Sequence, residues 1–158
     1  MSARERAVVR AGLLVLGVSQ AVVGVWALLG PQSFYDGFPA AGHAWVAVLP
    51  PFNEHLVRDV GGLSLAMTVV LAAAAWWLDA RLVWVAVVAF AAWTVGHTIF
   101  HVTHLEGFTG VDATLQTLGF VLQLGVTAAI AAVLARSGRR VGRAAGVARD
   151  DLTRRGTP

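Results

Sequence analysis

The chain has 158 residues, of which 57% are hydrophobic, and it carries a formal net charge of +3 at pH 7 with no cysteine. This length fits one domain, and the apolar excess excludes an ordinary water-soluble fold. The lack of cysteine excludes disulfides, thiolate metal sites and a cysteine nucleophile.

Four apolar runs approach or exceed the roughly 20 residues that a helix needs to cross about 30 Å of hydrocarbon. These runs cover residues 8–29, 60–78, 82–102 and 111–135. We therefore predict an all-α fold in which residues 1–135 form a bundle of four transmembrane helices. Residues 136–158 are predicted to form an Arg-rich, flexible cytoplasmic tail.

The arginines predict the orientation of the bundle. Three arginines lie within the first ten residues and seven follow residue 135, whereas segments 30–59 and 105–111 contain only Arg58 as a basic residue. Basic residues favour the cytoplasmic side, so both termini are predicted inside, in the cytoplasmic membrane. The first run is long for a signal peptide and no good cleavage site follows it, so it is predicted to be an uncleaved helix.

The segment 30–59 is long for a connection between membrane helices. It opens with Gly30-Pro31-Gln32-Ser33, a helix stop followed by the start of a short helix. Several aromatic residues follow, and they predict an extracytoplasmic loop that caps the mouth of the bundle. Asn53 is a predicted N-cap for the next helix.

The second long helix is predicted to begin with two interleaved i,i+4 pairs. Glu54 pairs with Arg58 and His55 pairs with Asp59. At an extracytoplasmic helix end these side chains have two interpretations. They are either structural ion pairs or part of a binding site.

Three histidines mark the third helix. His97, His101 and His104 fall within about 60° of each other on a helical projection. Ionisable side chains inside a bilayer are costly and usually face a bundle interior, so each is a candidate functional residue. The fourth helix has its own polar stripe, which includes Asp112 and Gln116.

The predicted topology brings these polar residues to one extracytoplasmic mouth. Imidazole and carboxylate groups suit a transition metal such as Fe, Cu or Zn, so the first hypothesis is a metal site in a small oxidoreductase or a subunit of one. The candidate ligands, with His97 and His101 first, are His97, His101, His104, His55, Glu54 and Asp112. The candidate residues that orient them are Asp59, Arg58, Gln116 and Asn53.

Three alternatives remain open at this point. The first alternative is haem or a quinone-type redox partner. Haem could be held by His97 or His101 together with His55, although only one helix is rich in histidine. A proton relay would need polar residues through the inner halves of the helices, which are almost entirely apolar. The polar cluster could also be a structural network, or the docking site of a partner protein or lipid, in a non-enzymatic membrane subunit.

The expected partners are the lipid bilayer and, through the Arg-rich tail, anionic lipids of the inner leaflet. A membrane protein partner or a homo-oligomer is a further candidate. Nucleic acid is not expected, because no folded domain presents the arginines of the tail.

Two runs carry a family resemblance. They are Pro51-Phe52-Asn53-Glu54-His55-Leu56-Val57-Arg58-Asp59-Val60-Gly61 and Gly96-His97-Thr98-Ile99-Phe100-His101-Val102-Thr103-His104. The chain resembles a group of uncharacterised actinobacterial four-helix integral membrane proteins, and it is similar to the DoxX-like group in size and layout. The resemblance implies a four-helix protein of the cytoplasmic membrane. It implies no particular activity, and no catalytic residue can be carried over from it.

Overall fold

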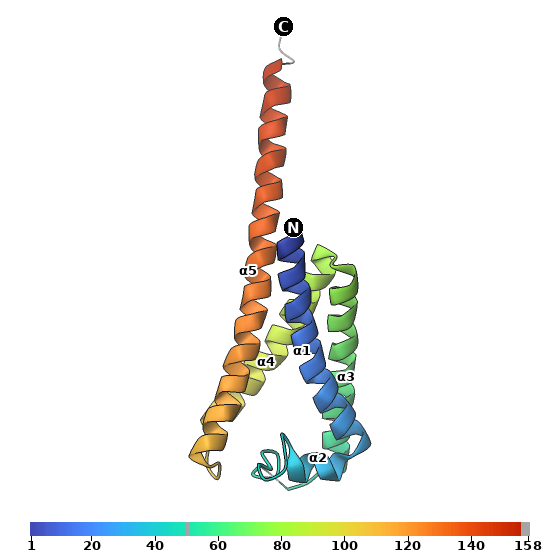
Figure 1. Ribbon diagram of the computed structural model, residues 1–158, viewed down its shortest axis with the longest axis vertical. Helices are drawn as coiled ribbons and strands as arrows, with labels where there is room; N and C mark the ends of the chain where they lie inside the picture. The colour runs from blue at the N-terminus through green and yellow to red at the C-terminus, as the bar shows by residue number, and fades with distance from the viewer. Residues whose placement is uncertain (50, 156–158) are drawn as a thin grey trace.

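The computed structural model describes residues 1–49 and 51–155, and this part of the chain contains helices and no strand (Figure 1). The helices are α1 (Ala3–Leu29), α2 (Pro31–Gly37), α3 (Glu54–Trp77), α4 (Ala80–Thr103) and α5 (Gly110–Arg155). Four of them, α1, α3, α4 and α5, are long and apolar enough to cross a membrane. The predicted all-α fold with four membrane-spanning helices is therefore confirmed.

Side-chain caps fix where the helices begin. The Ser2 hydroxyl accepts a hydrogen bond from the Glu5 amide while the Glu5 carboxylate accepts one from the Ser2 amide, which is a capping box. Asn53 accepts a bond from the Leu56 amide, so the predicted N-cap of α3 is confirmed. The carboxylate of Asp79 caps α4, so the turn between α3 and α4 is tight.

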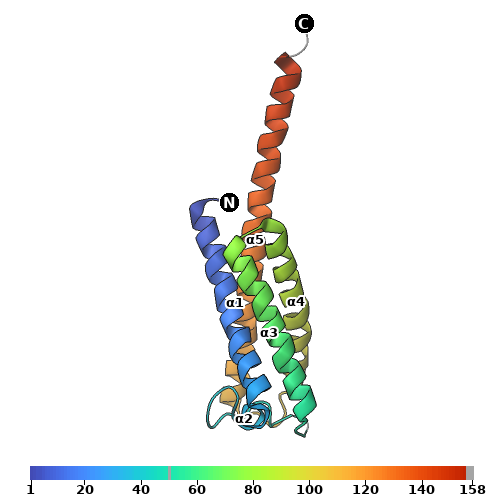
Figure 2. The ribbon, with the colours of Figure 1, turned by 90° about the vertical axis from the view of Figure 1, so that its right-hand side faces the viewer.

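The four long helices form two pairs that diverge toward α2. Helix α1 runs along α3 and α4 runs along α5, and the pairs separate at the end that carries α2 (Figures 1 and 2). We call this the loop end of the bundle and the opposite end, which holds the N-terminus, the packed end. Gly61 lets α1 and α3 stay in contact at the loop end, because a Cβ there would lie 2.6 Å from the Leu28 amide nitrogen.

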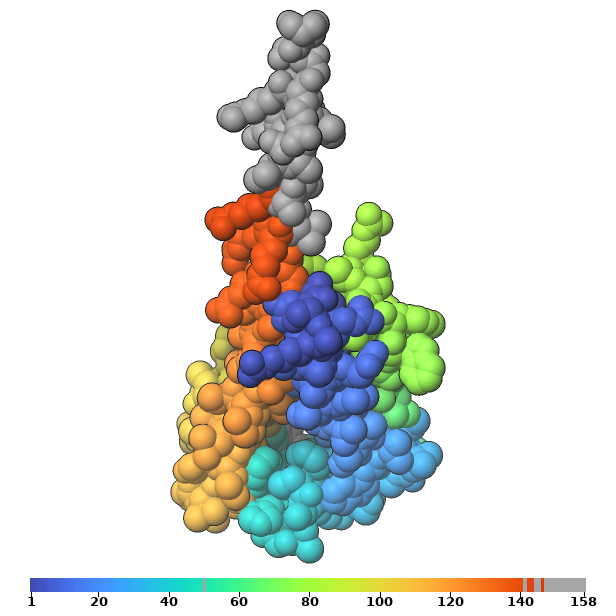
Figure 3. All heavy atoms as spheres, turned by 45° about the horizontal axis from the view of Figure 1, so that its top comes forward, coloured from blue at the N-terminus to red at the C-terminus, as the bar shows by residue number. Residues whose placement is uncertain are grey.

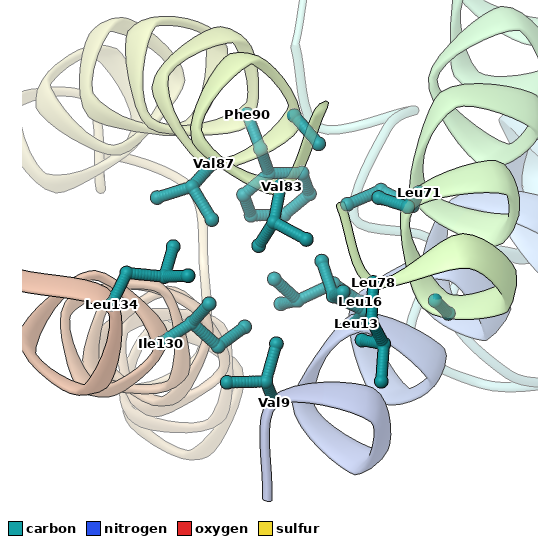
Figure 4. Close-up of a cluster of buried hydrophobic side chains, with 13 residues drawn as sticks. Val9, Leu13, Leu16, Leu71, Leu78, Val83, Val87, Phe90, Ile130 and Leu134 are labelled. Atoms are coloured by element: carbon teal, nitrogen blue, oxygen red, sulfur yellow. The ribbon is translucent and has the colours of Figure 1, made fainter. Parts of the chain in front are cut away.

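The packed end contains the main apolar core. Side chains from all four long helices point toward one another there (Figure 4). The residues of this core that are least exposed include Val9, Leu13, Leu71, Phe90 and Ile130. Close packing of this kind is what holds membrane helices together, since lipid tails are as apolar as the side chains themselves.

Helix α5 extends beyond the bundle instead of ending near residue 135. It continues to Arg155, so the predicted boundary between bundle and tail does not coincide with a helix end; residues 156–158 lie outside the described part. Arginine and alanine are good helix formers, which favours this continuation. Glu5 contacts Ser137 and Arg140 of α5 at 3.2 and 3.1 Å, and the start of α1 lies against α5 (Figure 3). The N-terminus and the described end of α5 lie toward the same end of the bundle (Figure 1).

Candidate ligand-binding site

A cavity of about 480 Å³ lies where the two helix pairs diverge, at the loop end. Its walls come from α1, α3, α4 and α5, and residues of α2 and of segments 38–49 and 51–53 line it as well. This volume falls within the range of about 300–1,000 Å³ that is typical of small-molecule sites.

Aromatic and amide or hydroxyl side chains dominate the lining of this cavity. The aromatic members are Phe34, Tyr35, Phe38, Trp45, Trp93, Phe100 and Phe120. The polar members are Gln20, Asn53, Ser64, Thr94, His97, His101, Gln116 and Gln123. An aromatic pocket with a few polar groups is the usual composition of a site for an organic ligand.

Three buried polar atoms have no hydrogen-bond partner in the described part of the protein, and all three belong to residues that line the cavity. They are Thr94 Oγ1, His101 Nδ1 and Gln116 Oε1. The exposed fractions of these three residues are only 2%, 9% and 3%, in the same order. A buried polar group without a partner costs about 1–3 kcal/mol. Buried polar groups usually have a partner, so three such atoms in residues around one cavity mark it as a candidate binding site.

The rings of His97 and His101 are neighbours in one aromatic wall. Their centroids lie 4.4 Å apart with the planes at 70°. His97 also stacks on Trp93 at 4.9 Å, and Phe120 of α5 lies 5.2 Å from both histidine rings. The predicted His97–His101 pair is thus in place, held between α4 and α5.

His104 does not join this pair. Helix α4 ends at Thr103, and His104 is its C-cap with φ −131° and ψ 65°, which turns the side chain off the helical face. The ring stacks on Phe100 at 4.2 Å, and its Nδ1 lies 2.8 Å from the Phe100 carbonyl oxygen. The sequence prediction placed His104 on the same face because it extended the helical projection past the helix end.

The predicted ion pairs at the start of α3 are present, but they lie outside the cavity. The Glu54 carboxylate accepts a 2.8 Å bond from Arg58, which also donates to the Leu28 carbonyl of α1. His55 lies 3.4 Å from Asp59 and its side chain is 87% exposed. These four residues thus act between α3 and α1 or at the surface, whereas the neighbouring Asn53 does line the cavity.

The Asp112 carboxylate holds the loop that follows α2 through hydrogen bonds. It accepts hydrogen bonds from His43 at 2.6 Å, Trp45 at 2.8 Å and Thr109 at 2.8 Å. Two of these donors come from segment 38–53 and the third precedes α5, so the carboxylate ties the loop to the start of α5. Trp45 also lines the cavity, which makes Asp112 part of its closure.

The six predicted metal ligands therefore lie in four separate surroundings: the His97–His101 pair, the cap of α4, the start of α3, and the loop contact of Asp112. No three histidine, aspartate or glutamate side chains of the described residues are grouped so that they could hold a metal ion. The predicted convergence of all six on one ion thus has no support in the geometry, and metal binding at His97 and His101 stays a prediction.

Two wall residues were missed in the sequence. Trp93 lies one turn before His97 on α4, and Phe120 lies one turn after Gln116 on α5. The i,i+4 spacing from the polar stripe would have identified both as sharing its face.

No protein-family model, curated protein or solved structure matches this chain. The resemblance to actinobacterial and DoxX-like membrane proteins stays a prediction, and the chemistry of the site is inferred from its own residues.

Proposed function

We propose that this protein binds a small organic ligand or cofactor inside the membrane, in the cavity at the loop end. The observation that carries the proposal is the gathering of three unpartnered buried polar atoms around a single cavity. A protein without a ligand would gain stability by replacing these groups with apolar ones, so their presence favours a binding role.

Each part of the cavity has a separate task in this proposal. His101 and Gln116 offer the polar contact to the ligand. Trp93, His97 and Phe120 supply flat surfaces that a ring can pack against. The contact of Asp112 with segment 38–53 keeps the outer side closed to water.

The distribution of arginine supports placing the loop end outside and both termini in the cytoplasm, within the cytoplasmic membrane. The arginines after residue 135 would then lie near anionic lipids of the inner leaflet. A redox-active ligand in the cavity would make the protein a small oxidoreductase or a subunit of one.

Native mass spectrometry of the untagged protein, purified from its own membrane in mild detergent, tests the proposal. We expect one retained non-phospholipid mass per chain, and we expect Gln116→Leu to lose it. The matched control is Gln32→Leu, because Gln32 is exposed on α2, where it donates a hydrogen bond to Asp36, and it does not line the cavity. If no such mass is retained, or if Gln116→Leu keeps it, the cavity is not a ligand site and the polar cluster is structural or binds a partner.

Metal binding by His97 and His101 is a second candidate, favoured by their adjacent rings and by the unpartnered His101 Nδ1. Ligands other than the predicted carboxylates would have to complete the coordination. Elemental analysis by plasma mass spectrometry would show near-stoichiometric iron, copper or zinc that His97→Ala removes. Metal at background level in protein prepared without chelators would remove this candidate.

A further inference from the structure

The side of the cavity between α3 and α4 faces the bilayer. Three of its lining residues are exposed on the outside of the bundle: Leu56 of α3 by 61%, and Trp93 and Phe100 of α4 by 40% and 42%. Helices α3 and α4 belong to different pairs, and they separate toward this end of the bundle (Figure 1). All three side chains are apolar or aromatic and belong to helices that can span a membrane, so this rim would contact lipid chains in a bilayer.

The outer side of the cavity is covered instead. Phe34 of α2 is buried against Val57 of α3, and Phe38 packs edge-on against Trp45 of the loop at 6.2 Å. Asp112 holds this loop in place through Trp45. A molecule that enters between the helix pairs thus comes more directly from the bilayer than from the water outside.

The lining also sets the charge of the occupant. No lysine, arginine, aspartate or glutamate of the described residues lines the cavity. A charged ligand would lose its hydration without gaining an opposite charge, which costs far more than such a site could return. The ligand is therefore neutral.

The polar contact selects a hydroxyl group. Gln116 Oε1 is a carbonyl oxygen and only accepts hydrogen bonds, so its partner must donate. His101 Nδ1 donates or accepts according to its tautomer. A hydroxyl does both, so it suits either tautomer, and it would also suit Gln116 with its amide turned over. A ketone or an ether only accepts.

The aromatic wall next to this contact favours a ring. His97 lies within one turn of His101 on α4, and it is held between Trp93 and Phe120. Aromatic pairs gain about 0.5–1.5 kcal/mol beyond the area they bury, so a hydroxyl that is attached to an aromatic ring fits both features.

We propose that the cavity takes up a neutral, lipid-soluble phenol from the bilayer and holds its hydroxyl between His101 and Gln116. The tail of such a molecule leaves between α3 and α4, past Leu56, into the lipid. This inference rests on the proposed function, since it names the class of ligand that the same cavity binds.

Three probes test the class and the source of the ligand. The full-length protein is placed in lipid nanodiscs that contain 4-nonylphenol or its methyl ether, 4-nonylanisole, at equal mole fraction, and in a third sample phenol is added to the water at the same total concentration. Native mass spectrometry counts the bound probe. We expect one 4-nonylphenol per chain, bound at least tenfold more tightly than the ether, and no bound phenol from the water.

Two variants complete the experiment. Gln116→Leu should lose most of the preference for 4-nonylphenol over the ether, because only His101 remains to contact the hydroxyl. Leu63→Ala is the control and should behave as the wild type. Leu63 lies on α3, two turns after Leu56, where its side chain is exposed and does not line the cavity. Retained circular dichroism and solubility show that each variant is folded.

Each of the other outcomes would contradict one part of the proposal. Equal binding of phenol and ether by the wild type would overturn the hydroxyl contact, and binding of aqueous phenol as tight as that of 4-nonylphenol would overturn uptake from the bilayer. If none of the probes binds while the protein retains another small molecule from its own membrane, the phenol class is wrong and the ligand site stands. If no molecule is retained in either experiment, the proposed function fails as well.

Discussion

The two ends of this bundle are built from the same four helices but differ in how they are packed. At the packed end, Val9, Leu13, Phe90 and Ile130 are at most 1% exposed and fill the space between the helices (Figure 4). At the loop end the helix pairs separate around a cavity of about 480 Å³ with unpartnered polar atoms in its wall. One end is therefore a filled apolar core, and the other holds the candidate site.

This difference explains how an apolar membrane protein keeps polar groups without partners. Packing at one end fixes the relative positions of the helices, so the other end can hold groups that cost stability. The contact between α1 and α3 at Gly61 extends to the loop end, so the cavity lies between the helix pairs and not within the α1–α3 pair. The comparison can be tested by matched substitutions at the two ends.

The largest effect is expected from removing an aromatic ring at the packed end. Phe90→Ala should lower the free energy of unfolding by about 3 kcal/mol, because it leaves a hole in a filled core. Phe120→Ala, in the cavity wall, removes the same ring next to space that is already empty, and we expect less than about half that loss. Unfolding in mixed detergent micelles measures both, and equal losses would contradict the difference between the ends.

A second test adds one methyl group where α1 and α3 cross. Gly61→Ala should cost about 2 kcal/mol, because its Cβ would meet backbone atoms of Leu28 and Gly24 at 2.6–3.0 Å. Gly62→Ala is the control, since a Cβ there meets nothing within 4 Å, and it should be neutral or stabilising by up to about 1 kcal/mol. The same unfolding assay applies. If both variants behave alike, the close approach at Gly61 does not hold the helix pair together.

The loop contact gives a third test, confined to one segment. Asp112→Ala leaves the donors of His43 and Trp45 without their acceptor, so segment 38–53 should open more often. We expect proteinase K to cleave this segment about tenfold faster while the helices stay protected. Asp36→Ala is the control, because Asp36 is exposed on α2 and accepts a hydrogen bond from Gln32 of the same helix. Unchanged cleavage in Asp112→Ala would show that other contacts hold the loop.

The smallest effect, and the one with the opposite sign, is expected at Thr94. Thr94→Val replaces a buried hydroxyl without a partner by a methyl group of similar shape, so the ligand-free protein should be stabilised by up to about 1 kcal/mol. Thr98→Val is the control, because the Thr98 hydroxyl donates a 2.6 Å bond to the Thr94 carbonyl and its loss should not stabilise. A clear destabilisation by Thr94→Val would mean that its hydroxyl has a partner, such as a bound water.

The fold could be predicted further than the site. Apolar runs of about 20 residues fix four spanning helices, and the N-cap Asn53 and the pairs Glu54–Arg58 and His55–Asp59 follow from local spacing. Helical spacing also paired His97 with His101. Local rules of this kind need no knowledge of how the helices are arranged.

The site depended on features that local spacing does not contain. The end of α4 at Thr103 moved His104 off the shared face, and the loop supplied His43 and Trp45 as partners for Asp112. The cavity itself results from the angle between the two helix pairs, which depends on long-range packing. The six predicted ligands therefore share one end of the bundle without sharing one site.

The most direct test of the account is an electron cryomicroscopy map of the protein in lipid nanodiscs made from its own membrane, at a resolution that shows side chains. The account predicts density for one organic molecule in the cavity, with a polar atom within hydrogen-bond distance of His101 Nδ1 and Gln116 Oε1. A cavity closed by repacked side chains, or filled only by ordered water that pairs with these atoms, would contradict it.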